Sequence, residues 1–161
     1  MKILFLCTHN SCRSILSEAL FNHIAPEGFI AYSAGSFPSG QVNPLTLEAL
    51  KRAGVSTLGL RSKSSDEFEY LAPDIVITVC DKAAGESCPL YFGKALRAHW
   101  GLADPSQLHS DAQALNSIVI TQAFDTTVDI IKTRLALFFK LPLESLSSAQ
   151  LQAALLQISQ D

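Results

Sequence analysis

The sequence carries little charge and no surplus of positive charge. Charged residues make up 17% of its 161 residues, and 12 lysines and arginines against 15 aspartates and glutamates leave a net charge of −3. Proteins that bind nucleic acid usually present a strongly basic face, so this balance argues against a nucleic-acid partner. A site for a small anion would depend on positive potential concentrated at one place. One short basic stretch, 61–65, could rim such a site, although stretches of this kind are more often simply solvated.

Long apolar runs are also missing. No segment approaches the roughly 20 apolar residues that a membrane-spanning helix needs, and we expect no membrane association. An apolar stretch follows Lys2, but Thr8 and Asn10 interrupt it before it reaches the roughly 7–15 residues of an export signal. We therefore expect a cytoplasmic protein, in which cysteines serve catalysis or metal binding more often than permanent disulfides.

The sequence also lacks internal repeats and low-complexity segments. Apolar residues form 48% of the chain, which is typical of a compact fold, and the length suits a single domain. Short strand-like runs alternate with longer helix-like segments, and this alternation predicts a parallel sheet with helices on both faces. The expected strands are 2–6, 29–33, 74–79 and 96–100, and the expected helices are 14–24, 44–53, one within 116–139, and 148–158.

We therefore predict the α/β class: a single three-layer domain with a four-stranded, mainly parallel sheet. The long helix presents one apolar stripe to the sheet, formed at steps of four and three by Phe124, Val128, Ile131, Leu135 and Phe138. We expect a main domain over 1–140 and a helical C-terminal extension over 141–161 that packs on it. Nothing in the sequence supports dimerisation, and we expect a monomer.

The most informative segment is 7–14, CTHNSCRS, which lies between an expected strand and an expected helix. A tight loop at a helix N-terminus offers several backbone N–H groups to a tetrahedral oxyanion. The helix dipole and the Arg13 guanidinium favour a thiolate at Cys7, and the planar Arg13 fork can hold two oxyanion oxygens. Ser14 can donate a hydrogen bond to the sulfur when the sulfur must leave. The oxyanion-binding residues that we predict are Thr8, His9, Asn10, Ser11, Cys12, Arg13 and Ser14.

This segment predicts an enzyme in which the sulfur of Cys7 attacks an oxyanion. The plainer interpretation is that Cys7 is a small buried residue at the end of a strand. A cysteine and an arginine separated by five residues also occur together by chance. The position between a strand and a helix, with Ser14 directly after Arg13, favours the enzyme.

A second pair of cysteines, Cys80 and Cys88, encloses seven polar or small residues. Neither this pair nor the pair of Cys7 and Cys12 has the spacing of a zinc finger, so we expect no metal site. The second pair is either inert and partly buried or exchanges thiols with Cys7. In a parallel sheet Cys7, Cys80 and Asp104 would share the carboxyl edge, because each follows an expected strand.

Residues 7–14 resemble the oxyanion loop of the low-molecular-weight tyrosine phosphatase superfamily, which shares the cysteine, the arginine after five intervening residues, and the serine that follows it. They resemble more closely the arsenate reductases of that superfamily, whose loop commonly reads Cys-Thr-Gly-Asn-Ser-Cys-Arg-Ser. His9 stands where that loop has glycine, which would strain the backbone if the position needs a positive φ. The stretch 99–105, in which His-Trp-Gly precedes Asp104, also resembles the reductases. The resemblance covers about residues 1–140.

An arsenate reductase of this superfamily would use three cysteines in sequence. By this resemblance Cys7 attacks arsenate, Cys80 attacks the sulfur of Cys7 and releases arsenite, and Cys88 moves the disulfide to the second pair. The resemblance implies an external thiol reductant, either thioredoxin or glutathione with glutaredoxin, and no tightly bound cofactor. The cellular role would be arsenic detoxification.

The same resemblance implies supporting roles. Asp104 matches the general acid, which protonates the oxygen that leaves. Residues that support the loop in relatives are matched by Asn10, Ser14 and Ser33. Cys12 stays open between a packing residue and a thiol that protects Cys7 through a reversible disulfide.

Two other functions stay open. A low-molecular-weight protein tyrosine phosphatase would use Cys7, Arg13 and Asp104 and would not need the second cysteine pair. Such phosphatases typically place one or two tyrosines directly after the Asp-Pro, whereas Ser106, Gln107 and Leu108 follow here. A non-enzymatic thiol sensor would use the cysteines without turnover. We expect arsenate reduction, with at most a weak phosphatase activity.

Overall fold

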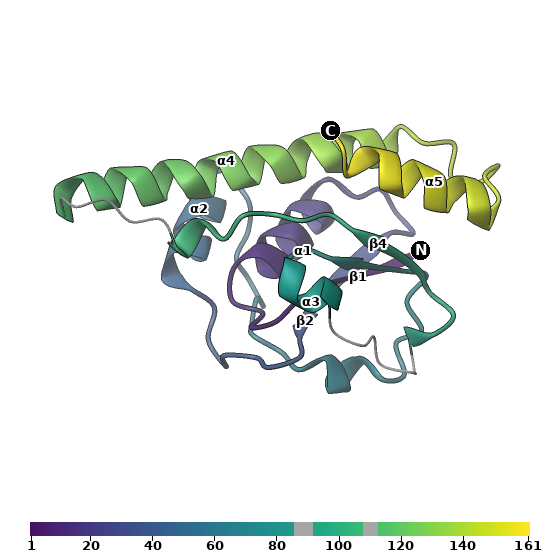
Figure 1. The fold of residues 1–161 in the computed structure, drawn as a ribbon, viewed down its shortest axis with the longest axis horizontal. Coiled ribbons are helices and arrows are strands. Elements are labelled where there is room, and N and C mark those ends of the chain that lie inside the picture. The colour runs from purple at the N-terminus through teal and green to yellow at the C-terminus, as the bar shows by residue number, and fades with distance from the viewer. Residues whose placement is uncertain (86–91, 108–112) are drawn as a thin grey trace.

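The computed structural model describes residues 1–85, 92–107 and 113–161, and Figure 1 shows its fold. Strands and helices alternate along the chain, as the sequence predicts. The strands are β1 (Lys2–Cys7), β2 (Ile30–Gly35), β3 (Ile75–Thr78) and β4 (Leu96–His99). The helices are α1 (Arg13–Ile24), α2 (Pro44–Arg52), α3 (Asp81–Gly85), α4 (Gln113–Phe139) and α5 (Ser148–Ile158), with the 3₁₀ helices η1 (Ser65–Phe68) and η3 (Pro105–Gln107).

The four strands form one sheet in the order β2-β1-β3-β4, and every neighbouring pair is parallel. The predicted four-stranded sheet is therefore confirmed. In its register Cys7 lies opposite Gly35, and Leu6 lies opposite Thr78. Because parallel strands end at the same edge, the residues that follow β1, β3 and β4 come together there.

The strand β1 lies inside the sheet and is apolar on both faces, because both faces are covered. Successive side chains of a strand point to opposite faces. Ile3 and Phe5 join one hydrophobic cluster, and Leu4 and Leu6 join the other. The side chains of these four residues are buried, and the strand ends at Cys7 on the carboxyl edge.

The larger cluster fills the space between the sheet and the helices α1, α2, α4 and α5. Figure 1 shows α4 running along the molecule, with α5 beside its C-terminal part. The predicted stripe on α4 is buried, with exposures of 4% or less for Phe124, Val128, Ile131, Leu135 and Phe138. Neither α4 nor any other helix in the described part of the chain is long and apolar enough to cross a bilayer.

The opposite face of the sheet has a thinner cover. Leu4, Leu6 and Val76 pack there with Phe92 and with Phe68 of η1. Among the described residues, η1 supplies Phe68 to this face, whereas residues of α1, α2, α3, α4 and α5 pack on the other. The two outer layers are therefore unequal in size.

The helix α5 has the bounds that the sequence predicts, Ser148–Ile158. Ser147 and Gln150 form a capping box at its start, in which each side chain bonds the other residue's backbone N–H. Its apolar face belongs to the larger cluster, and the Trp100 indole N–H donates to the Leu155 carbonyl at 3.0 Å. The helix thereby fixes Trp100, where the chain leaves β4 for the carboxyl edge.

In the part of the chain that the structure describes, the short elements α3, η1 and η3 are not apparent from the sequence. Each has five residues or fewer, which is too short for an apolar period to be recognised. The helix α3 begins directly after Cys80, and η3 begins directly after Asp104. Two of the three therefore start next to predicted site residues.

Candidate active site

Cys7 lies at the end of β1 with its side chain almost fully buried. The Asn10 backbone N–H donates to its sulfur at 3.2 Å, and the Ser14 hydroxyl oxygen lies 2.9 Å from the sulfur. Ser14 Oγ also accepts a hydrogen bond from Asn10 Nδ2 at 2.8 Å, which leaves the hydroxyl hydrogen for the sulfur. Two hydrogen bonds therefore converge on Sγ, as a sulfur anion needs in a buried position.

The loop between β1 and α1 turns its carbonyls away from Cys7. Three of these carbonyls accept backbone N–H groups from the segment after β2, each at 2.9 Å, in the pairs Phe37–Thr8, Ser39–His9 and Asn43–Ser11. In a trans peptide the C=O and the following N–H point in opposite directions. The N–H groups of His9, Asn10 and Cys12 therefore point away from the segment after β2. The Asn10 N–H donates to Cys7 Sγ, and those of His9 and Cys12 can serve a tetrahedral anion.

Asn10 fixes the shape of this loop. Its backbone has a φ of 46°, a left-handed conformation that asparagine adopts more readily than most residues. Its side-chain oxygen accepts the Lys63 backbone N–H at 2.8 Å, while its amide nitrogen bonds Ser14. The possible strain at His9 is not present, because the positive φ falls one residue later. The exposed His9 ring instead has its Nδ1 3.2 Å from the carbonyl oxygen of Phe37.

Gly35 is a site residue that the sequence reasoning missed. It ends β2 opposite Cys7, and a β-carbon built on it would lie 2.5 Å from the Thr8 carbonyl oxygen and 3.0 Å from the Asn10 nitrogen. Both are backbone atoms of the loop, so no flexible side chain can move aside and only glycine fits. A glycine inside a strand that pairs with the strand of Cys7 is the pattern by which it could be found.

Arg13 begins α1 and reaches the segment that follows β4. Its Nη1 donates to the Leu102 carbonyl at 3.0 Å, and its Nη2 lies 3.6 Å from Oδ2 of Asp104. Asp104 Oδ1 accepts the backbone N–H and the hydroxyl of Ser106, at 3.0 and 2.7 Å. The two charged side chains are 19% and 29% exposed, so solvent screens their attraction and the pair mainly fixes position. The structure thus brings Arg13 and Asp104 together at the carboxyl edge.

Cys80 directly follows β3 and is 3% exposed. Its sulfur lies 3.7 Å from the Thr8 hydroxyl oxygen and accepts the Ala83 backbone N–H at 3.3 Å. Because Thr8 is the neighbour of Cys7, the second cysteine contacts the loop of the first. Cys88 lies outside the described residues.

A surface contact also holds the segment that carries Cys80. Asp81 Oδ1 lies 2.9 Å from Nε2 of His99, and the other ring nitrogen of His99 lies 2.9 Å from the Thr78 hydroxyl. The ring therefore links the start of α3 to the ends of β3 and β4. The Asp81 carboxylate is 97% exposed, so this contact contributes little to stability.

Cys12 precedes the first residue of α1 and is buried. Burial raises the pKa of its thiol to about 12, and the hydrogen bond with Thr46 opposes this only in part. Thiol exchange requires the thiolate, so Cys12 is a poor partner for disulfide formation at neutral pH. Cys12 is therefore a weaker attacking thiol than an exposed cysteine at the same pH.

A buried ionic cluster lies behind the loop. The Lys63 ammonium donates to Glu18 Oε2 and to the Ser33 hydroxyl at 3.3 Å each, and to the Arg61 carbonyl at 2.8 Å. The Ser33 hydroxyl in turn donates to Glu18. Because the Lys63 backbone N–H holds Asn10, this cluster supports the loop from behind.

Lys63 corrects one expectation from the sequence. The stretch 61–65 is expected to be solvated, but the Lys63 side chain is 6% exposed. Burial lowers the pKa of Lys63, and the Glu18 carboxylate opposes that shift by favouring the charged form. Glu18 lies 45 positions away in the sequence, so a reading of the local stretch could not find this pairing.

The positive potential near the loop comes from a few groups of the chain. Among the described residues, no group of three or more His, Cys, Asp and Glu side chains is placed to hold a metal ion. The Arg13 guanidinium and the N-terminal end of α1 lie at the loop, and the Lys63 ammonium lies behind it. Arg13 lies near Asp104 and Lys63 pairs with Glu18, so the unpaired positive potential at the loop comes from the N-terminal end of α1 and its backbone N–H groups.

The chain matches a known protein family over most of its length. Residues 2–152 match the family described as low molecular weight phosphotyrosine protein phosphatase. Among curated proteins, the arsenate reductase of Staphylococcus xylosus is 36% identical over 104 residues, which are 65% of this chain and 78% of that protein. The arsenate reductase of Staphylococcus aureus (strain N315) has the same identity and coverage.

Solved structures share the fold. The thioredoxin-dependent arsenate reductase of Corynebacterium glutamicum is similar with a TM-score of 0.63 and 29% identity, and the match covers 86% of this chain and 60% of that one. The low molecular weight protein tyrosine phosphatase from T. tengcongensis gives a TM-score of 0.67 at 22% identity, over 88% of this chain and 99% of that one. At that identity the second likeness concerns the fold alone.

Proposed function

Because the chain belongs to the low molecular weight phosphotyrosine protein phosphatase family, we propose that it reduces arsenate to arsenite with Cys7 as the nucleophile. The observation that carries the proposal is the contact between the Cys7 loop and a second buried cysteine, with Thr8 Oγ1 3.7 Å from Cys80 Sγ. A phosphatase needs one nucleophilic sulfur, whereas arsenate reduction consumes two electrons, which two thiols supply when they form a disulfide. Similarity to the Staphylococcus arsenate reductases, at 36% identity, supports the same substrate.

In the first step the Cys7 thiolate attacks arsenic and forms a sulfur–arsenic bond while one arsenic–oxygen bond breaks. The N–H groups of the loop and the Arg13 fork bind the oxygens that stay. The oxygen that leaves is a hydroxyl of the protonated arsenate; it takes one proton from the Asp104 carboxyl and departs as water. The distance of 3.6 Å between Arg13 Nη2 and Asp104 Oδ2 supports this role, because the arginine that binds the oxyanion also holds the acid.

In the second step the Cys80 thiolate attacks the sulfur of Cys7. The sulfur–arsenic bond breaks and leaves its electron pair on arsenic, so arsenic(V) becomes arsenic(III) and arsenite departs. Cys7 and Cys80 are oxidised to a disulfide. The Cys88 thiolate then attacks the sulfur of Cys80, which releases Cys7 as a thiolate and leaves a disulfide between Cys80 and Cys88.

An external reductant must open this last disulfide before the next turnover. Thioredoxin is the reductant named for the similar Corynebacterium enzyme, and glutathione with glutaredoxin is the alternative. The reaction needs no tightly bound cofactor, because both electrons come from thiols. We expect it to run in the cytoplasm, where such reductants keep thiols reduced.

A coupled assay tests the proposal. The purified chain with thioredoxin, thioredoxin reductase and NADPH should oxidise NADPH only when arsenate is added, at a rate that saturates with arsenate. A second assay replaces thioredoxin and its reductase with glutathione, glutaredoxin and glutathione reductase. If neither mixture shows an arsenate-dependent rate, the chain is not an arsenate reductase.

Phosphate-ester hydrolysis is a second candidate, favoured by the match to the phosphatase family over residues 2–152. Cys7, Arg13 and Asp104 would serve it in the same positions. Ser106 and Gln107, where aromatic residues would grip a phosphotyrosine ring, favour a small oxyanion instead. Hydrolysis of p-nitrophenyl phosphate that needs Cys7, together with no reduction of arsenate, would make this the function.

A further inference from the structure

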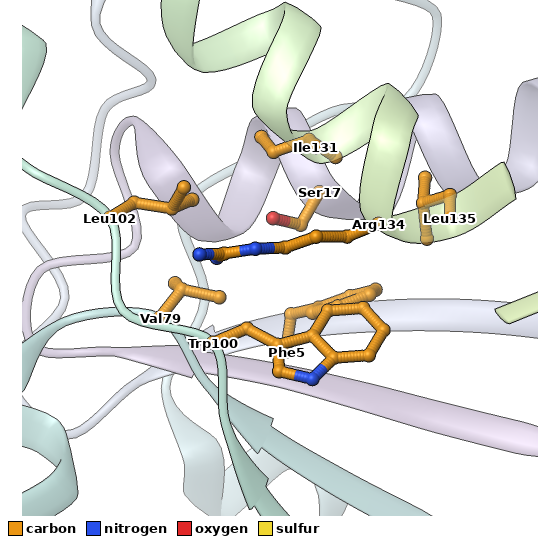
Figure 2. Close-up of a pocket in the computed structure, with 8 residues that line it drawn as sticks. All are labelled: Phe5, Ser17, Val79, Trp100, Leu102, Ile131, Arg134 and Leu135. Carbon is orange, nitrogen blue, oxygen red and sulfur yellow. The ribbon is translucent and has the colours of Figure 1, made fainter. Parts of the chain in front are cut away.

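Arg134 lies on α4, and its side chain reaches the segment that leads from β4 to Asp104. Figure 2 shows its side chain extending from α4 along a small cavity, with Ile131 on one side and Phe5 and Trp100 on the other. The cavity has a volume of about 10 Å³. Partial burial among these mostly apolar side chains lowers the pKa of Arg134.

The guanidinium has no carboxylate partner to offset this cost. None of the ion pairs in the described part of the chain includes Arg134. Its Nε is a buried side-chain atom without a hydrogen bond among the described residues. An apolar side chain of similar size would be less costly at this position, so stability alone does not account for an arginine here.

The hydrogen bond of Arg134 reaches the segment that carries Asp104. Nη1 of Arg134 donates to the Gly101 carbonyl at 3.2 Å. The next residue, Leu102, accepts Arg13 through its carbonyl at 3.0 Å, and Asp104 follows two positions later. Two guanidiniums, one from α4 and one from α1, therefore hold consecutive carbonyls of a segment that has no regular secondary structure.

We propose that Arg134 is a positioning residue for Asp104: it holds the Gly101 carbonyl and thereby sets where the Asp104 carboxyl meets the bound oxyanion. This inference rests on the proposed function, since it takes Asp104 as the proton donor. Arg134 itself touches no reacting atom. Without Arg134, Gly101 can shift, and Leu102 and Asp104 shift with it because they follow in the same short segment. The contacts of Leu102 and Asp104 with Arg13 are then lost.

A double-mutant cycle in the full chain tests the inference. The variants are R134M, R134K, D104N and the double variant R134M/D104N, each assayed for arsenate reduction and for p-nitrophenyl phosphate hydrolysis. R134M should lower kcat about tenfold and change KM less than about twofold, because a misplaced proton donor weakens the transition state and not the binding of the anion. R134K keeps the charge and loses the fork, so its kcat should fall between those of R134M and the wild type.

The double variant gives the decisive comparison. If Arg134 acts through Asp104, adding R134M to D104N should cost less than about twofold, because the acid is already missing. An equal loss of about tenfold in both backgrounds would show an independent role and overturn the inference. A wild-type kcat in R134M would overturn it as well.

R52M is the matched control. Arg52 lies 2.8 Å from Asp125 of α4 at the surface, so this variant also removes an arginine that bonds α4, at a place away from the acid. We expect its kcat to be unchanged. Thermal unfolding checks that each variant is folded, and R134K replaces R134M in the cycle if R134M does not fold.

The two reactions separate this inference from the proposed function. If the wild type hydrolyses the ester and does not reduce arsenate, the proposed function fails and the cycle is still decided by hydrolysis. If the wild type carries out neither reaction, Asp104 donates no proton and both proposals fall.

Discussion

The two cysteines of the site are held in very different ways. Around Cys7, two hydrogen bonds converge on the sulfur, three loop carbonyls bond the segment after β2, and a buried ion pair supports the loop from behind. Around Cys80, the sulfur has a 3.7 Å contact with Thr8 and one N–H from α3, a helix of five residues. An exposed contact between Asp81 and His99 ties that helix at the surface.

This difference matches the two steps of the proposed reaction. A nucleophile that binds a tetrahedral anion gains from fixed geometry, because misplaced groups lower the rate. A cysteine that bonds first with Cys7 and then with Cys88 has to change partners, so weak restraint suits it. A helix of five residues is far below the roughly 12 residues that an isolated helix needs, so tertiary contacts decide whether α3 forms.

We expect the largest effect from Cys7→Ser, which removes the sulfur of the firmly held Cys7 loop. Without the sulfur neither arsenate nor a phosphate ester can be attacked, and both activities should fall by about 10⁴-fold or more. The coupled assay and p-nitrophenyl phosphate hydrolysis measure this, with thermal unfolding as the check on folding. Turnover that persists in either reaction would remove Cys7 as the nucleophile.

Cys80→Ser distinguishes the role of Cys80 from that of the Cys7 loop. Steady-state arsenate reduction should be abolished, because no second thiol can take arsenic off Cys7. Ester hydrolysis should stay within about threefold of the wild type, since water completes that reaction and the Cys7 loop is intact. A parallel loss of both activities would mean that Cys80 serves the loop's structure and not the relay.

Asn10→Ala removes side-chain hydrogen bonds that hold the Cys7 loop and leaves the sulfur of Cys7 in place. It leaves the Lys63 N–H without a partner and removes one of the two hydrogen bonds of the Ser14 hydroxyl, which should cost about 1–3 kcal/mol in the free energy of unfolding. We expect kcat in both reactions to fall about 100-fold, because the loop loses its shape.

Asn22→Ala is the matched control for that variant. Asn22 bonds the backbone of Ala31 on β2 through both atoms of its amide, at 2.8 and 3.0 Å. The control should lower stability by a similar amount and leave kcat unchanged. An equal loss of kcat in both variants would mean that general destabilisation, and not the loop, explains the effect of Asn10→Ala.

Asp81→Asn probes the weakly held side. Removing the charge loosens the contact with His99 at the start of α3, so arsenate turnover should fall about threefold while ester hydrolysis stays unchanged. Steady-state kinetics of the two reactions measure the ratio. A fall in ester hydrolysis as well would place the effect in the Cys7 loop instead.

Cys12 should give the smallest effect. Cys12→Ser should keep kcat within about twofold of the wild type, because a neutral buried thiol takes no part in exchange. Alkylation by iodoacetamide followed by mass spectrometry should modify Cys12 in the folded protein only at strongly alkaline pH. Ready alkylation near neutral pH, or a large loss of activity, would contradict this assignment.

The raised pKa of Cys12 also fixes the sign of a pH effect. The thiol has a pKa of 9.0 when unfolded and about 12 when folded, so between these values the unfolded chain has released a proton that the folded chain keeps. The free energy of unfolding should therefore decrease as pH rises through this range. Cys12→Ser should lack that part of the decrease, as chemical denaturation at several pH values would measure.

The fold was largely predictable because short stretches of sequence indicate most of its helices and strands. The apolar stripe of α4 and the serine before α5 can be recognised from neighbouring residues alone, and the four strands fall within two residues of their predicted ends. The Cys7 loop is contiguous in the sequence, so its residues could be named before its geometry was known.

The supporting residues were not predictable because distant contacts define them. Lys63 belongs to a polar stretch until the fold brings Glu18 to it, and Gly35 is one of eight glycines until the register sets it opposite Cys7. Nothing in the local sequence distinguishes Arg134 from the other charged residues of α4, because its partner is a carbonyl 33 positions earlier. The burial and the hydrogen bonds of these residues depend on contacts that form only when the chain has folded.

Trapping the first disulfide tests the central claim most directly. Reduced Cys88→Ser protein is mixed with one equivalent of arsenate, quenched with an alkylating agent and mapped by mass spectrometry, while released arsenite is counted. The account predicts one arsenite per chain, a disulfide between Cys7 and Cys80, and a free Cys12 thiol. A disulfide between Cys7 and Cys12, or arsenite released while Cys80 stays a thiol, would contradict it.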